Sequence, residues 1–344
     1  MRLLAAVFAV AGAAVGFIGW GATTSAAVPA LSSRLLVYAT PPGVGDGACR
    51  PECRPDRAWV WRAAVDGRKR TRLTHGLAPT VSPDGRWVAF VRERRDGTQT
   101  EIDLIGSRGG SVRRLMRLEA QKPAYKLSWA PDSGRLVGEF VGRLVSLSPD
   151  GEITSLDAAA NLGQISFSPD GLQIAYVKTV IAPRGYLSDV YVTSVSGGAA
   201  RRITSEGDAD GLAWGRDGIA FLRNDGNDWI VQPDGSGLRQ LTRGSFWIRP
   251  VAWSQDGTRL LGENPPTHNG RLWAVDGQTG TARTITGWVG GLDALALSRD
   301  GRTILATTGH GGFVGCAGRI ETIPYAGGRA RVLLPQICDA SWNA

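Results

Sequence analysis

A short apolar segment followed by a tight polar turn recurs six times along the chain, and each turn contains Asp. The six copies are Thr80–Gly85, Leu127–Asp132, Ile165–Gly171, Leu212–Gly218, Val251–Gly257 and Leu295–Gly301. From Asp84 to Asp300 the turns span 216 positions in five intervals, an average period of 43.2 residues. A fixed period of this length is the signature of a repeat architecture.

Each repeat continues with further apolar runs separated by turns. After Ile165–Gly171, for example, the runs are Gln173–Val177, Asp189–Val192 and Arg202–Thr204. Short β-branched and aromatic runs broken by Asp-Gly or Gly-Gly predict antiparallel strands, because Asp accepts local N–H groups and Gly adopts positive φ. Four strands in roughly 40 to 45 residues predict an all-β fold, a β-propeller of four-stranded antiparallel blades.

The two ends of the chain indicate how the ring closes. Leu35–Tyr38 is typical of a second strand with no partner before it, and Asp339–Trp342 resembles a first strand with nothing after it. We therefore expect the C-terminal strand to pair beside Leu35–Tyr38 and close the ring, which removes exposed sheet edges. Dividing the length after residue 30 by the period favours seven blades. Six blades is the alternative, because the third repeat is weak.

Residues 1–30 have the features of a targeting segment. Arg2 precedes a charge-free apolar run from Leu3 to Ala22, and small residues follow at Ser25–Ala27. These features predict a secretory signal peptide, and the length of the run leaves an uncleaved N-terminal anchor as the alternative. We expect a single propeller domain over residues 31–344 in an exported protein, located outside the cell, in the periplasm or at the cell envelope.

The apolar-Trp-Ser strand followed by Pro-Asp-Gly resembles the WD-repeat-like propeller repeat of the TolB family, from about Leu31 to Ala344. This resemblance implies a TolB-like propeller and is unspecific for function. The same repeats also precede the hydrolase domain of prolyl-oligopeptidase-like enzymes, but the Gly-x-Ser-x-Gly nucleophile elbow of such hydrolases is absent from the chain.

In such a propeller, the loops between second and third strands share one face with the connections between blades. The four cysteines, Cys49, Cys53, Cys316 and Cys338, all map to this face. An even number of cysteines in an exported protein indicates disulfides. Closure of the ring brings the last blade beside the first, so we expect the pairs Cys316–Cys338 and Cys49–Cys53. Four free buried thiols are the alternative.

The same face collects the candidate binding residues. They are His75, Phe246, Trp247, His268, Trp288 and His310. Histidines on one face can build a metal or acid–base site, although solvated loop histidines are the simpler interpretation. The aromatic residues lie in connections between blades, where contact with a ligand is expected.

Acidic residues gather in two segments of the fifth repeat. Asp208 and Asp210 lead into its first strand, and Asp225 and Asp228 lie in its next loop. Their oxygens suit a hard cation, so Ca²⁺ is a candidate cofactor, with solvated turn formers as the alternative and no other cofactor expected.

Positive charge is concentrated near the N-terminal end. Residues 50–117 hold 16 Arg and Lys against 8 Asp and Glu. The predicted basic patch consists of Arg68, Lys69, Arg70, Arg92, Arg94, Arg95, Arg113, Arg114 and Arg117. Such a patch attracts anionic partners, and for an exported protein we expect an envelope protein or an anionic cell-wall polymer rather than nucleic acid. A merely soluble surface is the alternative.

Three functions fit these observations. The favoured hypothesis is a non-catalytic, monomeric binding or scaffold module for an exported or envelope protein. A hydrolase or lyase acting at the central channel is the first alternative, and a cation-stabilised structural protein is the second. No reactive arrangement of residues is apparent from the spacing, and propellers serve many functions.

Overall fold

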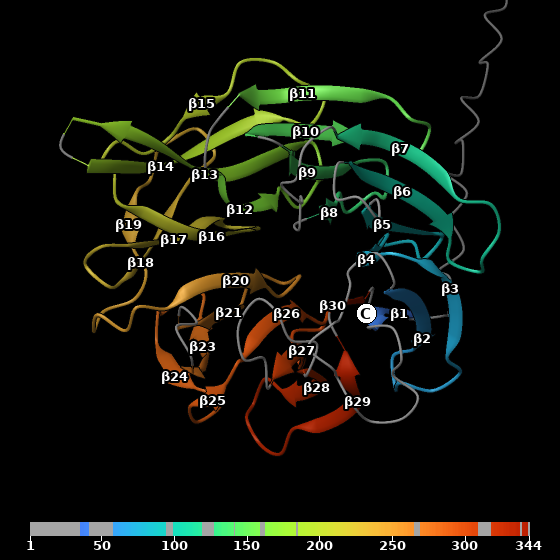
Figure 1. The fold of residues 1–344 in the computed structure, drawn as a ribbon. Coiled ribbons are helices and arrows are strands. Elements are labelled where there is room, and N and C mark those ends of the chain that lie inside the picture. The colour runs from blue at the N-terminus through green and yellow to red at the C-terminus, as the bar shows by residue number, and fades with distance from the viewer. Residues whose placement is uncertain are drawn as a thin grey trace, which may run out of the picture. The chain divides into compact units, whose positions relative to one another are not determined.

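Seven four-stranded antiparallel sheets form a ring in the part of the chain that the structure describes (Figure 1). The structure is a computed structural model, and it describes residues 35–40, 58–93, 99–118, 127–140, 142–158, 162–183, 185–264, 269–308, 318–337 and 339–342. No helix occurs in these ranges. The fold is the predicted seven-bladed β-propeller, and the six-bladed alternative is wrong.

Each blade is a four-stranded sheet, and six of the seven follow the chain in order. Blade 2 contains β4 (Leu77–Val81), β5 (Trp87–Glu93), β6 (Thr100–Gly106) and β7 (Arg113–Leu118). Blade 3 contains β8 (Leu127–Trp129), β9 (Leu136–Phe140), β10 (Arg143–Leu147) and β11 (Ile153–Ala158). Blade 4 contains β12 (Leu162–Phe167), β13 (Gln173–Ala182), β14 (Gly185–Ser194) and β15 (Arg201–Arg202).

The remaining blades repeat this order. Blade 5 contains β16 (Ala209–Gly215), β17 (Gly218–Arg223), β18 (Asp228–Val231) and β19 (Arg239–Gln240). Blade 6 contains β20 (Arg249–Trp253), β21 (Arg259–Glu263), β23 (Leu272–Asp276) and β24 (Ala282–Thr284), and blade 7 contains β26 (Asp293–Leu297), β27 (Thr303–Thr308), β28 (Gly318–Pro324) and β29 (Arg331–Ile337). A two-stranded ribbon of β22 (Asn269–Gly270) and β25 (Val289–Gly290) links the β21–β23 loop to the connection that leaves blade 6.

Blade 1 is completed by both ends of the chain. Its strand order is β3 (Thr71–His75), β2 (Trp59–Ala64), β1 (Leu35–Thr40) and β30 (Asp339–Trp342). Leu36 lies opposite Trp342, and Ala39 lies opposite Asp339. The predicted pairing of the C-terminal strand beside Leu35–Tyr38 is therefore confirmed. Residues Leu31–Ala344 form one compact unit, and all described strands pair within it.

The recurring turn is held by a Ser–Asp pair. Ser82 Oγ donates to Asp84 Oδ1 at 2.6 Å, and the same carboxylate accepts the N–H of Arg86 at 3.0 Å. Ser254 and Ser298 donate to Asp256 and Asp300 in the same way. The following glycine needs positive φ, as at Gly85 with φ 71°. This local chemistry explains why Ser-x-Asp-Gly marks the first turns of blades 2, 4, 6 and 7.

The core lies between the blades. Buried side chains of adjacent sheets pack together, and the repeat tryptophans Trp129 and Trp214 are among them. Trp129 donates its indole N–H to the Thr80 carbonyl of blade 2 at 3.2 Å, and Trp253 donates to Ala213 of blade 5 at 3.0 Å. The large rings therefore fill the space between blades and satisfy their own donors there.

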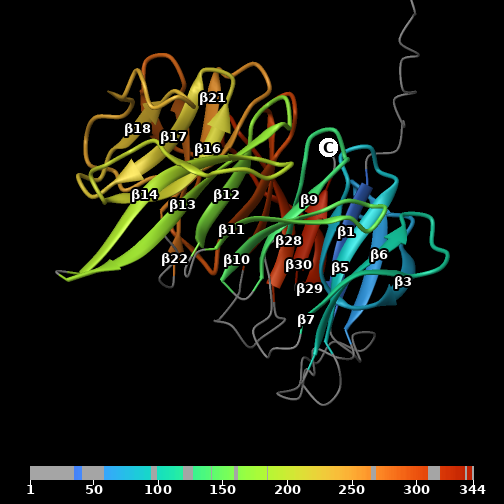
Figure 2. The ribbon, with the colours of Figure 1, turned by 90° about the horizontal axis from the view of Figure 1, so that it is seen from above.

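The two faces of the ring differ in their loops. One face, the turn face, carries the turns between the first and second strands of the blades. The other, the open face, carries the loops between the second and third strands and the connections between blades (Figure 2). The targeting segment predicted over residues 1–30 lies outside the described residues. Within the described ranges, no helix has the length and apolar character required to cross a membrane.

Candidate functional site

The connection from blade 5 to blade 6 presents an aromatic side chain on strained backbone. It runs between β19 and β20 on the open face and contains the predicted binding residues Phe246 and Trp247. Ser245 and Trp247 have positive φ, at 52° and 54°. For side chains with a Cβ this conformation costs about 1 kcal/mol or more per residue, and it persists only where the surroundings fix it. The Trp247 side chain is 48% exposed.

Two asparagines fix this connection. Asn227 Oδ1 accepts the N–H groups of Gly244 at 3.1 Å and Ser245 at 3.0 Å. Asn264 Nδ2 donates to the carbonyls of Phe246 at 3.0 Å and Trp247 at 3.1 Å. The polar groups of the blade 5 loop and of the end of blade 6 thus hold the backbone that carries the exposed indole.

The rings behind Trp247 complete this support. Asn264 Oδ1 accepts the indole N–H of Trp273 at 2.7 Å, and the Trp273 ring lies 5.2 Å from that of Phe246. Phe246 packs onto the buried cluster around Leu241 and Ile248. Phe246 is therefore a supporting core residue, and Trp247 is the residue of the pair that faces solvent.

Two further predicted residues contact neighbouring side chains. Trp288 is 60% exposed and lies under the Arg271 guanidinium, whose carbon is 4.5 Å from the ring centroid. The His75 ring is tilted by 35° against that of Trp59, with 3.4 Å between the ring centroids, and Arg72 lies over the Trp59 ring at 3.9 Å. These contacts make Trp288 a second exposed aromatic on the open face, while His75 belongs to a cluster with Trp59 and Arg72 in blade 1.

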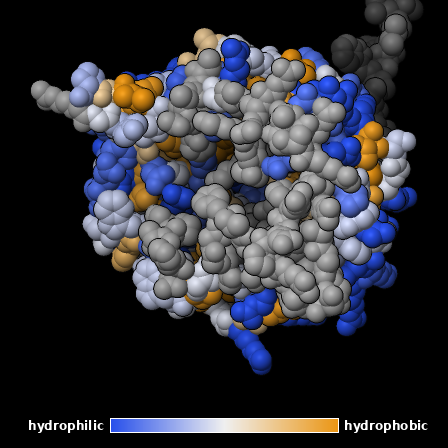
Figure 3. All heavy atoms as spheres, viewed as in Figure 1, coloured by the Kyte–Doolittle hydropathy of each residue, from blue (hydrophilic) through white to orange (hydrophobic). Residues whose placement is uncertain are grey.

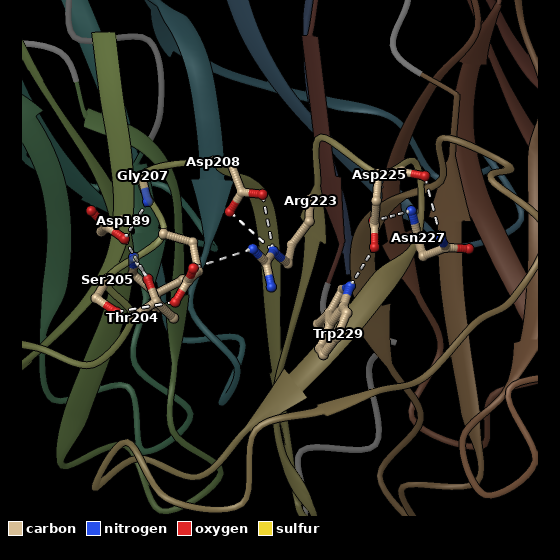
Figure 4. A network of polar contacts seen from close by, with 11 residues as sticks. Asp189, Thr204, Ser205, Gly207, Asp208, Arg223, Asp225, Asn227 and Trp229 are labelled. Carbon is tan, nitrogen blue, oxygen red and sulfur yellow. Dashed lines mark hydrogen bonds and ion pairs between the residues drawn. The ribbon is translucent and has the colours of Figure 1, made fainter.

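Three of the four acidic residues predicted to hold Ca²⁺ contact partners of their own, and Figure 4 shows the contacts of Asp208 and Asp225. Both carboxylate oxygens of Asp208 accept from Arg223 Nε at 3.0 Å. Asp210 lies 3.5 Å from Arg249 Nη2. Asp225 accepts the indole N–H of Trp229 at 3.0 Å and the N–H of Asn227 at 2.9 Å.

The structure therefore does not bring these carboxylates together. Among the described residues, no group of three or more His, Cys, Asp and Glu side chains is placed to hold a metal ion. The physical reason is that Arg223 and Arg249 reach these side chains from neighbouring strands. Arg223 pairs with Asp208 and Arg249 with Asp210, so each arginine occupies a carboxylate that was expected to bind Ca²⁺. The predicted cluster is instead a set of ion pairs and turn contacts.

Asp228 differs from the other three. Its side chain is fully buried, and neither carboxylate oxygen has a hydrogen-bond partner among the described residues. Burial raises the pKa of Asp228 well above its usual range, and the nearby charge of Asp225 adds to the rise. Burial therefore favours the protonated form of Asp228, which lies at the base of the loop that carries Asn227.

The basic residues lie mainly on outer strands of blades 1 and 2. Arg68, Lys69 and Arg70 occupy the turn before β3, and Arg113, Arg114 and Arg117 lie on β7. Arg114 and Arg117 share the Glu101 carboxylate at 2.9 and 3.0 Å. Arg92 belongs to another environment, because it pairs with the buried Asp103 at 3.1 Å. The patch is thus partly neutralised.

Several predicted residues lie outside the described residues. They are Cys49, Cys53, Arg94, Arg95, His268, His310, Cys316 and Cys338. The two disulfides and the histidine site therefore stay predictions.

Sequence reasoning missed Asn227 and Asn264. Asn227 lies in the sequence Asn-Asp-Gly-Asn, which indicates only a turn, and Asn264 follows β21 without any motif. Their role depends on carbonyl and N–H groups about 17 residues away in the chain. The one signal in the sequence was that the two asparagines lie near Trp229 and Trp273, which belong to the third strands of blades 5 and 6.

Comparison with known proteins places this fold. The sequence matches no protein-family model, and no curated protein matches it. Among solved structures, TolB from Acinetobacter baumannii is similar over 84% of this chain and 80% of its own, with 16% identity and a TM-score of 0.54. The fold is thus a TolB-like β-propeller, as the repeat predicted.

Structures of enzymes share the same fold. An oligogalacturonate lyase from Vibrio parahaemolyticus is 11% identical, with a TM-score of 0.56. The match covers 74% of this chain and 76% of the lyase. A puromycin-hydrolyzing peptidase from Mycobacterium tuberculosis is 16% identical with a TM-score of 0.59, and the match covers 83% of this chain but 51% of the peptidase. Similarity at this level shows the fold alone, so the function must be argued from the residues of the site.

Proposed function

We propose that this chain is a non-catalytic binding module of the cell envelope that docks a protein on its open face, with Trp247 as the central anchor. The observation that carries the proposal is the exposed indole of Trp247, which stands on backbone with positive φ that Asn227 and Asn264 hold in place. Strain that the surroundings maintain at a solvent-exposed residue is a mark of function.

The chemistry of the anchor suits a protein partner. Trp, Tyr and Arg dominate the binding energy of protein interfaces, because they bury large areas and also offer polar groups. A side chain that is already fixed loses little conformational entropy on binding. The exposed Trp288 beside Arg271 supplies a second contact of the same kind.

The carboxylates of the open face support a binding role over a catalytic one. Asp208 and Asp210 are engaged by Arg223 and Arg249, so their charges orient loops. A carboxylate in an ion pair of this kind is occupied by its partner, whereas a general acid or base needs access to a substrate. The export segment predicted over residues 1–30 supports the proposed envelope location.

The test is chemical crosslinking of the cell envelope, followed by recovery with residues 31–344 as bait. The wild type, Trp247→Ala and the matched control Leu172→Ala are compared, because Leu172 is 61% exposed but lies at the turn face. We expect one protein to be recovered with the wild type and the control and to be lost with Trp247→Ala. Equal recovery with Trp247→Ala contradicts the proposed anchor, and turnover of lactone or uronate substrates without any recovered protein favours an enzyme.

A further inference from the structure

The β13–β14 hairpin extends beyond its blade as a projecting arm (Figures 1 and 2). Both strands have ten residues and pair along their whole length. The neighbouring strands stop earlier, because β12 pairs with β13 only as far as Lys178 and β15 pairs with β14 only at Tyr191 and Val192. Beyond these points the two strands of the arm pair with each other, apart from one bridge between Ser188 and Asp208.

The end of this arm is apolar and exposed. Eleven large hydrophobic side chains are exposed among the described residues, and four of them are Val180, Ile181, Tyr186 and Leu187. Ile181 is 80% exposed and Tyr186 is 71% exposed. In the space-filling view, apolar atoms gather where the arm leaves the ring (Figure 3). A soluble protein rarely concentrates apolar surface in this way without an interaction site.

The apolar side chains lie on both faces of the arm. Ile181 is opposite Tyr186, and Val180 is opposite Leu187. Because successive residues of a strand point to opposite faces, the two pairs face opposite ways. A protein partner that adds to one face leaves the other pair in water, whereas a fluid lipid layer surrounds both faces.

Charge and polarity also fit a lipid surface. The segment from residue 178 to residue 188 contains Arg184 and no acidic residue. Tyr is enriched at the membrane–water interface, since its ring is apolar and its hydroxyl is polar. The hydroxyls of Thr179 and Ser188, hydrogen-bonded at 2.8 Å, form a polar boundary behind the apolar end.

We propose that the tip of the arm, Val180 to Leu187, enters the interfacial layer of an anionic lipid bilayer. The insertion is shallow, because the outer edges of the two strands carry N–H and C=O groups that need water and are too costly to place in hydrocarbon. This lipid contact is independent of the protein-docking role of Trp247, since the two use different residues.

The experiment measures sedimentation of residues 31–344 with vesicles of phosphatidylglycerol and phosphatidylcholine in equal parts, and with phosphatidylcholine alone. This unit is used because it contains all described strands and the closed ring. We expect binding to the anionic vesicles that weakens when salt is raised from about 0.1 M to about 1 M, because added ions screen the attraction. Ile181→Ser with Tyr186→Ser is expected to weaken binding at least tenfold, from the loss of apolar burial.

Leu172→Ser is the matched control. It removes an apolar side chain that is 61% exposed just before β13, about 30 Å from the arm's tip along the strand, and is expected to bind like the wild type. The absence of vesicle binding, or equal binding by the double variant, overturns the proposal. The competing explanation is that the tip binds a second copy of the chain, and analytical ultracentrifugation tests it. A dimer that forms with the wild type and disappears with the double variant also overturns the lipid proposal.

Discussion

Asp228 donates its backbone N–H to Thr242 Oγ1 at 2.8 Å, and this places its carboxyl at a position that is apolar in the adjacent blades. Val190 and Leu272 donate to Thr204 and Thr286 in the same way, also 14 residues apart, and both side chains are fully buried. Asp228 thus replaces an aliphatic residue of the repeat, directly beside the asparagine that holds the Trp247 connection.

Replacing Asp228 by Val should stabilise the protein. Burial of a carboxyl without a hydrogen-bond partner is costly, so we expect Asp228→Val to raise the free energy of unfolding by about 2 kcal/mol at pH 7.5. The folded-state pKa is raised, so the folded protein binds more protons than the unfolded chain above pH ~4, and the stability due to this site falls as pH increases from there.

Urea unfolding at pH 4.5 and pH 7.5 measures both effects. Asp228→Val should raise the free energy of unfolding by more at pH 7.5 than at pH 4.5. A variant less stable than the wild type at pH 7.5 indicates that the carboxylate has a partner that stabilises its charged form.

The pair of Arg92 and Asp103 gives a second pH-dependent prediction. Burial raises the pKa of Asp103 to about 6, while the Arg92 charge acts against this rise. Without Arg92 the pKa should rise further, so Arg92→Gln should cost more stability at pH 7.5, where Asp103 is ionised, than at pH 5. Arg86→Gln breaks the exposed pair with Asp84 and serves as the control, with a loss of about 0.5 kcal/mol or less at either pH.

Trp247→Gly should separate stability from binding. Glycine relieves the positive φ, which offsets the lost indole contacts, so we expect the free energy of unfolding to stay within about 1 kcal/mol of the wild type. Partner binding should fall at least tenfold, because the anchor is removed.

Ser245→Gly is the companion variant for Trp247→Gly. It relieves positive φ in the same connection and keeps the indole, so it should retain partner binding. Thermal unfolding and the recovery of the crosslinked protein measure the two properties. Equal loss of binding in both variants would show that the connection, and not the indole, carries the interaction.

The predicted disulfides remain open to a direct test. Peptide mapping without reduction should recover Cys316 joined to Cys338 and Cys49 joined to Cys53. In the chain-entropy view, a loop of the size between Cys316 and Cys338 contributes roughly 3 kcal/mol by restricting the unfolded chain. Reduction should therefore lower the thermal transition, and recovery of Cys316 as a free thiol contradicts the pairing.

The fold could be predicted from local chemistry because each blade repeats the same turn. Ser82 and Asp84 hold their turn through contacts within a few residues, so the pattern is visible in the chain itself. The closure by Asp339–Trp342 was also predictable, since an unpaired second strand at one end requires a first strand from the other.

The site was less predictable because its contacts are long-range. The acidic segments suggested a cation, but Arg223 and Arg249 reach Asp208 and Asp210 from other strands. Asp228 has the sequence context of a turn, and its burial becomes apparent only when blades 4, 5 and 6 are aligned in space. The projecting arm depends on where β12 and β15 stop, which no local pattern encodes.

Site-specific photocrosslinking in living cells tests the role of the open face most directly. A benzophenone side chain replaces Arg243, which is exposed in the same connection as Trp247, so that the indole is kept; a second protein carries it at position 172 on the turn face. We predict one crosslinked protein from position 243 and none from position 172. No product from position 243, or the same products from both positions, would contradict a docking site on the open face.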